Sequence, residues 1–136
     1  MSLVQWSDEL TVGVAAVDDD HRKLFSLVNY LYDSMVAGRE RPVVDDFINS
    51  LLIYTREHFA REEAFFEETG YPDSFVHKKE HDDLIRQITD VRESFKSGAT
   101  PQKTLEMIGF LNKWLIEHIR KSDKKYAPHL HAQGIS

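Results

Sequence analysis

Four segments of the chain carry apolar residues at alternating steps of three and four, and this spacing constrains the fold most. Such steps place side chains on one stripe of an α-helix, which repeats every 3.6 residues. A stripe of this kind has to be buried against other stripes. The stripes are His21, Leu24, Val28, Leu31 and Met35; Val44, Phe47, Leu51, Tyr54, His58, Glu62 and Phe65; His77, His81, Leu84, Ile88, Val91 and Phe95; and Leu105, Ile108, Leu111, Leu115 and His118.

Three loops separate these segments, and in each a glycine is followed by a proline. The pairs are Gly38 and Pro42, Gly70 and Pro72, and Gly98 and Pro101. Glycine just past a helix end and proline at the next helix start is the asymmetry typical of helices. We therefore predict four helices, an N-terminal arm and a C-terminal tail. The helices cover about 18–37, 41–69, 73–97 and 100–121, the arm 1–17 and the tail 124–136.

Short connections indicate how the helices are arranged. Asp18 or Asp19, Asp73 and Thr100 are candidate N-caps of the first, third and fourth helices. Because the loops are short, consecutive helices have to run antiparallel. The sequence thus predicts an all-α fold, an up-down-up-down antiparallel four-helix bundle. We expect one domain over residues 1–136, a common domain length.

The composition excludes several classes of protein. The net charge of −6 argues against a nucleic-acid partner, because phosphate binding requires a basic face. There is no cysteine, which excludes disulfides, thiolate metal sites and cysteine nucleophiles. We find no secretory signal and no apolar run of the ~20 residues that span a membrane. The expected location is therefore cytoplasmic, without membrane insertion.

Polar residues occupy positions on the apolar stripes, where burial without a partner is costly. They are His21, His58, Glu62, His77, His81 and His118. A single one of them would be read as a core histidine bonded to a carbonyl. In an antiparallel bundle, however, the starts of the first and third helices meet the ends of the second and fourth. All six residues then converge at one end of the bundle, which favours metal binding over separate structural roles.

Asp123 is a seventh candidate ligand, and its spacing is irregular. His58 and Glu62, like His77 and His81, are four residues apart and share one helix face. Asp123 follows His118 by five residues, roughly 140° around an ideal helix. To reach the same point, Asp123 requires a loosened helix end or a π-bulge. The alternative interpretation is a solvated aspartate at a helix end.

The types of donor atom restrict which metals this site could bind, but they do not identify one metal. Imidazole with carboxylate suits iron, zinc, copper or nickel. Seven donors exceed one tetrahedral zinc site and fit two metals that share carboxylates. The two Glu-x-x-His motifs of ferritin-like bundles are absent, as is the His-Glu-x-x-His motif of zinc proteases. A catalytic Ser–His–Asp triad stays an open alternative, although the sequence contains no nucleophile-elbow motif.

These residues and spacings resemble the hemerythrin family, in its single-domain bacterial type. The resemblance runs from Trp6 to about Tyr126. It includes the segment Val-Gly-Val-Ala-Ala-Val-Asp-Asp-Asp-His that ends at His21, and three spaced motifs. The motifs are His58-x-x-x-Glu62, His77-x-x-x-His81 and His118-x-x-x-x-Asp123.

The resemblance implies a non-haem di-iron centre (Fe²⁺/Fe³⁺) that binds dioxygen reversibly, for storage, delivery or scavenging. One iron would be held by His77, His81 and His118, and the other by His21 and His58 with an open position. Glu62, Asp123 and a solvent-derived oxygen would bridge the irons. The family's apolar oxygen pocket would correspond to Leu24, Phe59, Trp114, Leu115 and Ile119, which are also ordinary core residues.

Two other functions are compatible with the same centre. One is a di-iron oxidase or peroxidase, and the other is an oxygen or iron sensor that acts through a separate partner. Two carboxylates against five neutral histidines favour oxygen binding without turnover, so we expect no enzyme activity. Nothing in the sequence names an organic substrate or a protein partner. His129 and His131, beyond Pro128 in the polar tail, are not expected to bind metal.

Overall fold

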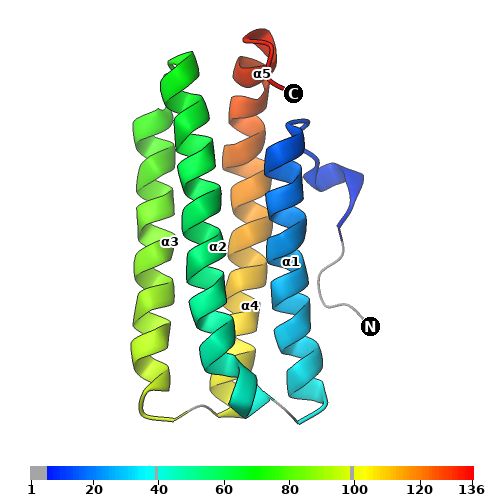
Figure 1. Cartoon of the computed structure of the whole chain (residues 1–136), viewed down its shortest axis with the longest axis vertical. Helices are drawn as coiled ribbons and strands as arrows, with labels where there is room; N and C mark the ends of the chain where they lie inside the picture. The colour runs from blue at the N-terminus through cyan, green and yellow to red at the C-terminus, as the bar shows by residue number, and fades with distance from the viewer. Residues whose placement is uncertain (1–5, 39, 99) are drawn as a thin grey trace.

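In the computed structural model, which describes residues 6–38, 40–98 and 100–136, the chain is a bundle of long helices (Figure 1). No strand occurs among those residues. The predicted all-α four-helix bundle is therefore confirmed. The elements are η1 (Asp8–Leu10), α1 (Ala15–Val36), α2 (Glu40–Thr69), α3 (Ser74–Phe95), α4 (Pro101–His118), η2 (Ile119–Asp123) and α5 (Lys124–Ala132).

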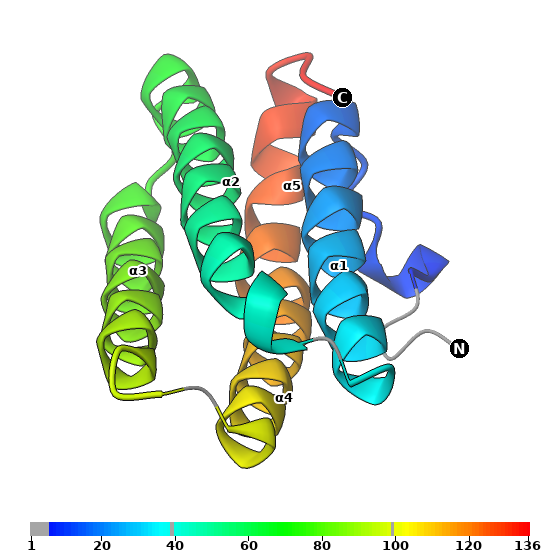
Figure 2. The same ribbon diagram turned by 60° about the horizontal axis from the view of Figure 1, so that its bottom comes forward.

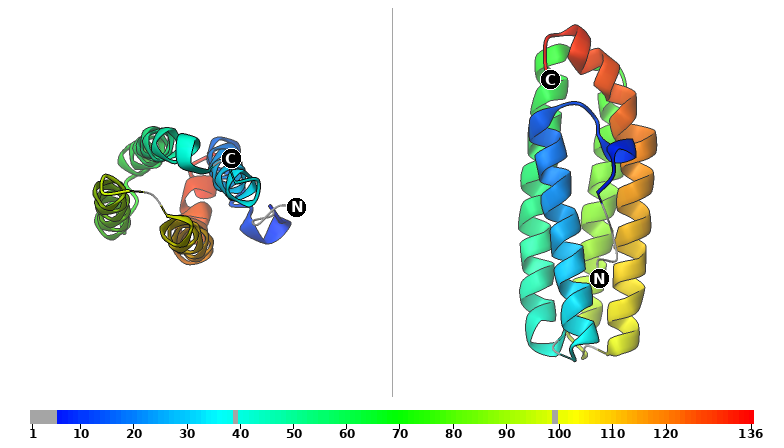
Figure 3. Two further views of the ribbon diagram at one scale, coloured as in Figure 1. Left: turned by 90° about the horizontal axis from the view of Figure 1, so that it is seen from below. Right: turned by 90° about the vertical axis from the view of Figure 1, so that its right-hand side faces the viewer.

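The four long helices run up and down in chain order, so that α1 and α3 lie at opposite corners of the bundle (Figures 2 and 3). Gly38, Gly70 and Gly98 all have positive φ just past a helix end, as the loop pattern predicts. The start of α1, the end of α2, the start of α3 and the end of α4 therefore share one end of the molecule (Figure 1).

The helix starts agree only in part with the predicted caps. Thr100 caps α4, its hydroxyl accepting a bond from the Lys103 N–H, 3.1 Å away. Asp73 occupies the N-cap position of α3 without a capping bond. The first helix begins earlier than predicted, at Ala15, and Asp18 lies inside it. The buried Asp18 carboxylate instead accepts bonds from the backbone N–H groups of Val12 and Gly13, and so fixes the arm to α1.

The segment predicted as a polar C-terminal tail, residues 124–136, is largely helical, so a further helix follows the four that were predicted. The fourth helix passes without a break through η2, a short π-helix, into α5 (Figure 1). Tyr126, Ala127 and Leu130 of α5 are buried, because they pack on the end of the bundle. Tyr126 packs on Phe66 of α2 and His77 of α3, and such contacts with other helices are not visible in the periodicity of a nine-residue segment.

Two stripe residues are exposed, contrary to the prediction. Tyr54 is 43% and Leu105 50% exposed, whereas the neighbouring Thr55 and Thr104 are buried. At these two positions α2 and α4 are therefore each rotated by about one residue from the predicted orientation. The other stripe residues are buried or half-buried, among them Val28, Leu31 and Ile88.

The N-terminal arm leads from η1, which lies against η2, to the start of α1 (Figure 3). Residues 1–5 of the predicted arm lie outside the described residues. Among the residues that are described, no helix has both the length and the apolar composition needed to cross a membrane.

Candidate metal centre

All seven predicted ligands lie at one end of the bundle, and every one of them is buried. The helix α1 supplies His21, α2 supplies His58 and Glu62, and α3 supplies His77 and His81. The helix α4 ends on His118, and η2 ends on Asp123. Residues as far apart in the chain as His21 and Asp123 are thus brought together because consecutive helices reverse direction.

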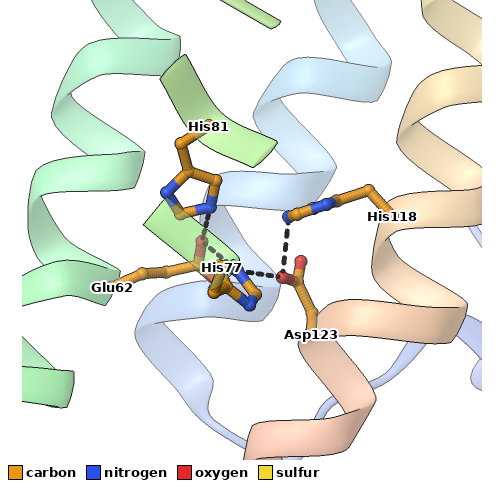
Figure 4. A group of neighbouring side chains, drawn as sticks. All are labelled: Glu62, His77, His81, His118 and Asp123. Atoms are coloured by element: carbon orange, nitrogen blue, oxygen red, sulfur yellow. Dashed lines mark ion pairs between the residues drawn. The ribbon is translucent and has the colours of Figure 1, made fainter. Parts of the chain in front are cut away.

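The seven side chains form two overlapping groups, in each of which the potential ligand atoms lie within 4.8 Å of one another. The three-histidine group consists of Glu62, His77, His81, His118 and Asp123 (Figure 4). The two-histidine group consists of His21, His58, Glu62 and Asp123. Glu62 and Asp123 belong to both groups, which is the arrangement needed for carboxylates that bridge two ions.

The π-helix η2 brings Asp123 into the site. A π-turn takes up one residue more than an α-turn, and so corrects the five-residue spacing from His118. The Asp123 carboxylate lies 3.1 Å from both His118 Nε2 and His77 Nε2, and 3.0 Å from His21 Nε2. The predicted local bulge is therefore present, and Asp123 is fully buried rather than solvated.

The donor atoms fit a central cation better than they fit one another. Glu62 Oε1, both Asp123 oxygens and the Nε2 atoms of His77, His81 and His118 are buried without a hydrogen-bond partner. Several of them approach within 3.1 Å, yet none is aligned for a hydrogen bond. Such a set of buried polar atoms would be costly if it stayed unpaired. Metal ions in this space would satisfy these atoms together.

Carboxylates behind three of the histidines fix the direction of the rings. His58 Nδ1 lies 2.9 Å from Asp20, His81 Nδ1 3.1 Å from Glu63, and His118 Nδ1 3.0 Å from Glu80. A carboxylate that accepts the Nδ1 proton leaves the Nε2 lone pair free for a metal and makes it more basic. In the sequence these acids lie next to ligand positions but look like ordinary surface charges, so the pattern did not identify them.

Tyr126 is a further residue of the site, and the sequence pattern gave no sign of its role. Its ring is fully buried, and its hydroxyl donates a short hydrogen bond to Glu62 Oε2. Burial, together with the negative charges of Glu62 and Asp123, raises the pKa of Tyr126 well above its usual value. The phenol therefore stays protonated and holds one oxygen of Glu62, while Oε1 faces His81 Nε2 at 3.1 Å.

Opposite charges dominate the electrostatics of the centre. Burial raises the pKa of Glu62, and so does the nearby Asp123, but His58, His77 and His81 outweigh both and lower it to about 2. Burial likewise opposes ionisation of Asp123, yet His118, His21 and His77 hold its pKa well below the usual value. For His77, burial lowers the pKa, whereas Asp123 and Glu62 raise it to about 9. Both carboxylates are therefore ionised and strongly attract positive charge.

A small apolar cavity of about 10 Å³ adjoins the two-histidine group. At that size it holds roughly one water-sized molecule. Besides the candidate ligands His21, His58, His118 and Asp123, its walls are Leu24, Leu51, Thr55, Phe59, Leu84, Ile88, Leu111, Trp114, Leu115 and Ile119. All five residues predicted for an oxygen pocket are among them. Phe59 also stacks on the ring of His81, and Trp114 on that of His118.

His129 and His131 lie on α5, outside both ligand groups. His129 Nε2 is 3.0 Å from the Thr69 carbonyl, and His131 Nε2 is 3.0 Å from the Gly13 carbonyl. Each imidazole thus connects α5 to another part of the bundle, which is a structural role.

Replacing both His129 and His131 with alanine should leave the metal content unchanged and lower stability modestly. Each lost hydrogen bond contributes about 1 kcal/mol. Metal analysis of the purified variant and chemical denaturation measure the two effects separately. Loss of bound metal in a variant that still folds would show that the ligand set is incomplete.

Comparisons with known proteins agree with this architecture. The family model for the hemerythrin HHE cation binding domain matches residues 12–130. The bacteriohemerythrin of Pseudomonas aeruginosa is 35% identical over 126 residues, covering 93% of this chain and 80% of the relative. That of Methylococcus capsulatus is 34% identical over 133 residues, covering 97% and 100%. A crystal structure of wild-type hemerythrin matches with a TM-score of 0.83 and 33% identity, over 95% of this chain and 98% of that one. The chain therefore belongs to the hemerythrin family.

Proposed function

We propose that this protein binds dioxygen reversibly at a non-haem di-iron centre. The observation that carries the proposal is the pair of ligand groups that share Glu62 and Asp123 beside an apolar cavity. His77, His81 and His118 would hold one iron, and His21 and His58 the other. Glu62, Asp123 and a solvent-derived oxygen would bridge the pair. Membership of the hemerythrin family favours iron among the metals that such ligands suit.

The charge of the ligand set supports binding rather than turnover. The two carboxylates contribute two negative charges, and the five imidazoles bind as neutral ligands. Sites richer in carboxylate stabilise higher oxidation states of iron more strongly. When bound, the iron pair supplies an open coordination position and the electrons that reversible oxygen binding requires.

The cavity provides the surroundings that such a role needs. Beyond the ligands, its only polar side-chain groups, among the described residues that line it, are the Thr55 hydroxyl and the Trp114 indole N–H. Neither is an acid or a base near neutral pH. Leu24, Leu115 and Ile119 line the space beside His21 and His58 with apolar surface, which offers a water molecule no hydrogen bond. Since irreversible release of superoxide or peroxide from such a centre would need water or protons, these side chains should slow that release.

A combined metal and oxygen measurement tests the proposal. Protein produced with ample iron should contain two irons per chain. After anaerobic reduction it should gain a visible absorption band under oxygen and lose the band on degassing, through repeated cycles. One iron per chain, or zinc alone, would contradict the di-iron centre. A band that decays at once with stoichiometric release of hydrogen peroxide would favour the oxidase alternative.

Shortening Leu115 to alanine should make the oxygen-bound form decay faster. Leu115 is buried in the cavity wall, and the smaller side chain leaves room for water beside the centre. The variant should also lose about 2–5 kcal/mol of stability. The decay of the visible band in air measures the effect, with Leu105→Ala, at an exposed position of the same helix, as the control. Equal decay in both variants would mean that the cavity wall does not protect the centre.

A further inference from the structure

The two ligand groups are unequal. The three-histidine group offers three imidazoles and two carboxylates, whereas the two-histidine group offers two imidazoles and the same two carboxylates. We propose that the metal positions fill in order. The three-histidine position takes the first ion and holds it tightly, and the two-histidine position takes the second and exchanges it readily. This inference rests on the proposed function, because it assumes a centre of two ions.

The carboxylates behind the histidines reinforce this difference. In the three-histidine group, His81 Nδ1 lies 3.1 Å from Glu63 and His118 Nδ1 lies 3.0 Å from Glu80. Glu80 is itself held by the Ser122 hydroxyl, which donates a hydrogen bond of 2.6 Å to it. Two of the three imidazoles are therefore oriented in advance and made better donors to a metal.

The two-histidine group has weaker support. His58 Nδ1 lies 2.9 Å from Asp20 Oδ2, but the Arg61 guanidinium donates to the same oxygen at 3.3 Å. That positive charge draws electron density away from the carboxylate behind His58. His21 Nδ1 is buried without any hydrogen-bond partner. When Nε2 of His21 binds a metal, Nδ1 carries the proton, so a buried N–H group stays unpaired and metal binding there is less favourable.

The position of the cavity and the charge of the first ion also make binding of the second ion weaker. Both histidines of the two-histidine group line the cavity, but only His118 of the three-histidine group does. On that side the cavity walls are almost wholly apolar, so an ion in the two-histidine position gains no further protein ligand there. A second cation also enters against the charge of the first, since Glu62 and Asp123 are shared. The singly loaded protein should thus leave the cavity-side position empty.

Anaerobic titration of the metal-free protein with Co²⁺, followed by visible absorption, tests the order of filling. The expected result is two phases, the first with an affinity at least about 10-fold higher than the second. His21→Ala should keep the first phase and lose the second, whereas His81→Ala should weaken the first. Two equal phases, or loss of the first phase in His21→Ala, would overturn the inference. Saturation at one Co²⁺ per chain would instead overturn the di-metal centre itself.

Two conservative variants test the order of filling even if an alanine variant fails to fold. Glu80→Gln and Asp20→Asn keep the side-chain volume and each act through one histidine. Glu80→Gln should weaken the first phase by roughly 10–100-fold, and Asp20→Asn should weaken only the second by a similar factor. Circular dichroism checks that both stay helical. If both variants weakened the same phase, the assignment of His58 and His118 to different positions would be wrong.

Discussion

Glu62→Ala is expected to remove both metal ions, the largest effect of any single substitution in this protein. Glu62 is completely buried and belongs to both ligand groups. Its Oε1 lies 3.1 Å from His81 Nε2 and 3.4 Å from His58 Nε2, one imidazole of each group. The substitution takes a ligand and a negative charge from both positions. Affinity should therefore fall at both by more than the roughly 10–100-fold that losing an outer hydrogen bond costs.

Glu63→Ala is the matched control, because Glu63 is the next residue of the same helix. Its only contact with a candidate ligand, among the described residues, is with His81 Nδ1; its other ion-pair partner is the Lys78 ammonium at 3.9 Å, and it faces solvent in part. Its loss should weaken the three-histidine position and leave the other unchanged. Metal analysis after gel filtration, with Glu62→Gln as a variant of equal volume, measures these effects. Two tightly bound ions in Glu62→Ala would rule out a bridging carboxylate at this position.

The metal-free protein should lose stability as the pH rises from about 6.5 to about 9, whereas the iron-loaded protein should release iron as the pH falls. In the metal-free state the pKa of His77 is raised to about 9, because Asp123 and Glu62 outweigh the effect of burial. A raised folded-state pKa gives stability that is complete below the unfolded value of 6.5 and disappears as the pH passes about 9. For His77 this amounts to as much as about 3 kcal/mol.

The carboxylates determine how the stability of the same metal-free protein changes at acidic pH. The pKa of Glu62 is lowered to about 2 from 4.5, mainly by His58, His77 and His81 against the opposing effect of burial. A lowered folded-state pKa gives stability that is present above pH 4.5 and disappears as the pH falls toward 2. The metal-free protein should therefore be most stable between about pH 4.5 and 6.5.

Bound iron reverses the alkaline part of this profile. A metal replaces the proton on each imidazole, so protons compete with iron and acid releases it. The stabilisation by iron should then grow from about pH 6 to about pH 9. Urea denaturation with and without iron at several pH values measures this difference. His77→Gln should flatten the alkaline loss in the metal-free protein. A stabilisation by iron that does not change with pH would contradict the proposed imidazole ligands.

The sequence by itself determined the elements that depend on local pattern. Apolar steps of three and four predicted the four helices, and Gly38, Gly70 and Gly98 marked their ends, because helix periodicity and positive φ are properties of neighbouring residues. Short loops fixed the antiparallel order, which in turn placed His21, His58, His77 and His118 at one end. The five-residue spacing also indicated an irregular turn before Asp123 as one of two interpretations, and the structure decided between them.

Only the tertiary structure decided which residues support the centre from behind. Asp20, Glu63, Glu80 and Tyr126 carry no spacing signal, since each contact crosses between helices and depends on their rotation and relative height. The same rotation exposed Tyr54, which the pattern had placed in the core. A helical repeat defines a stripe to within about one residue. The contacts of single atoms in the metal centre are fixed only when the helices pack together.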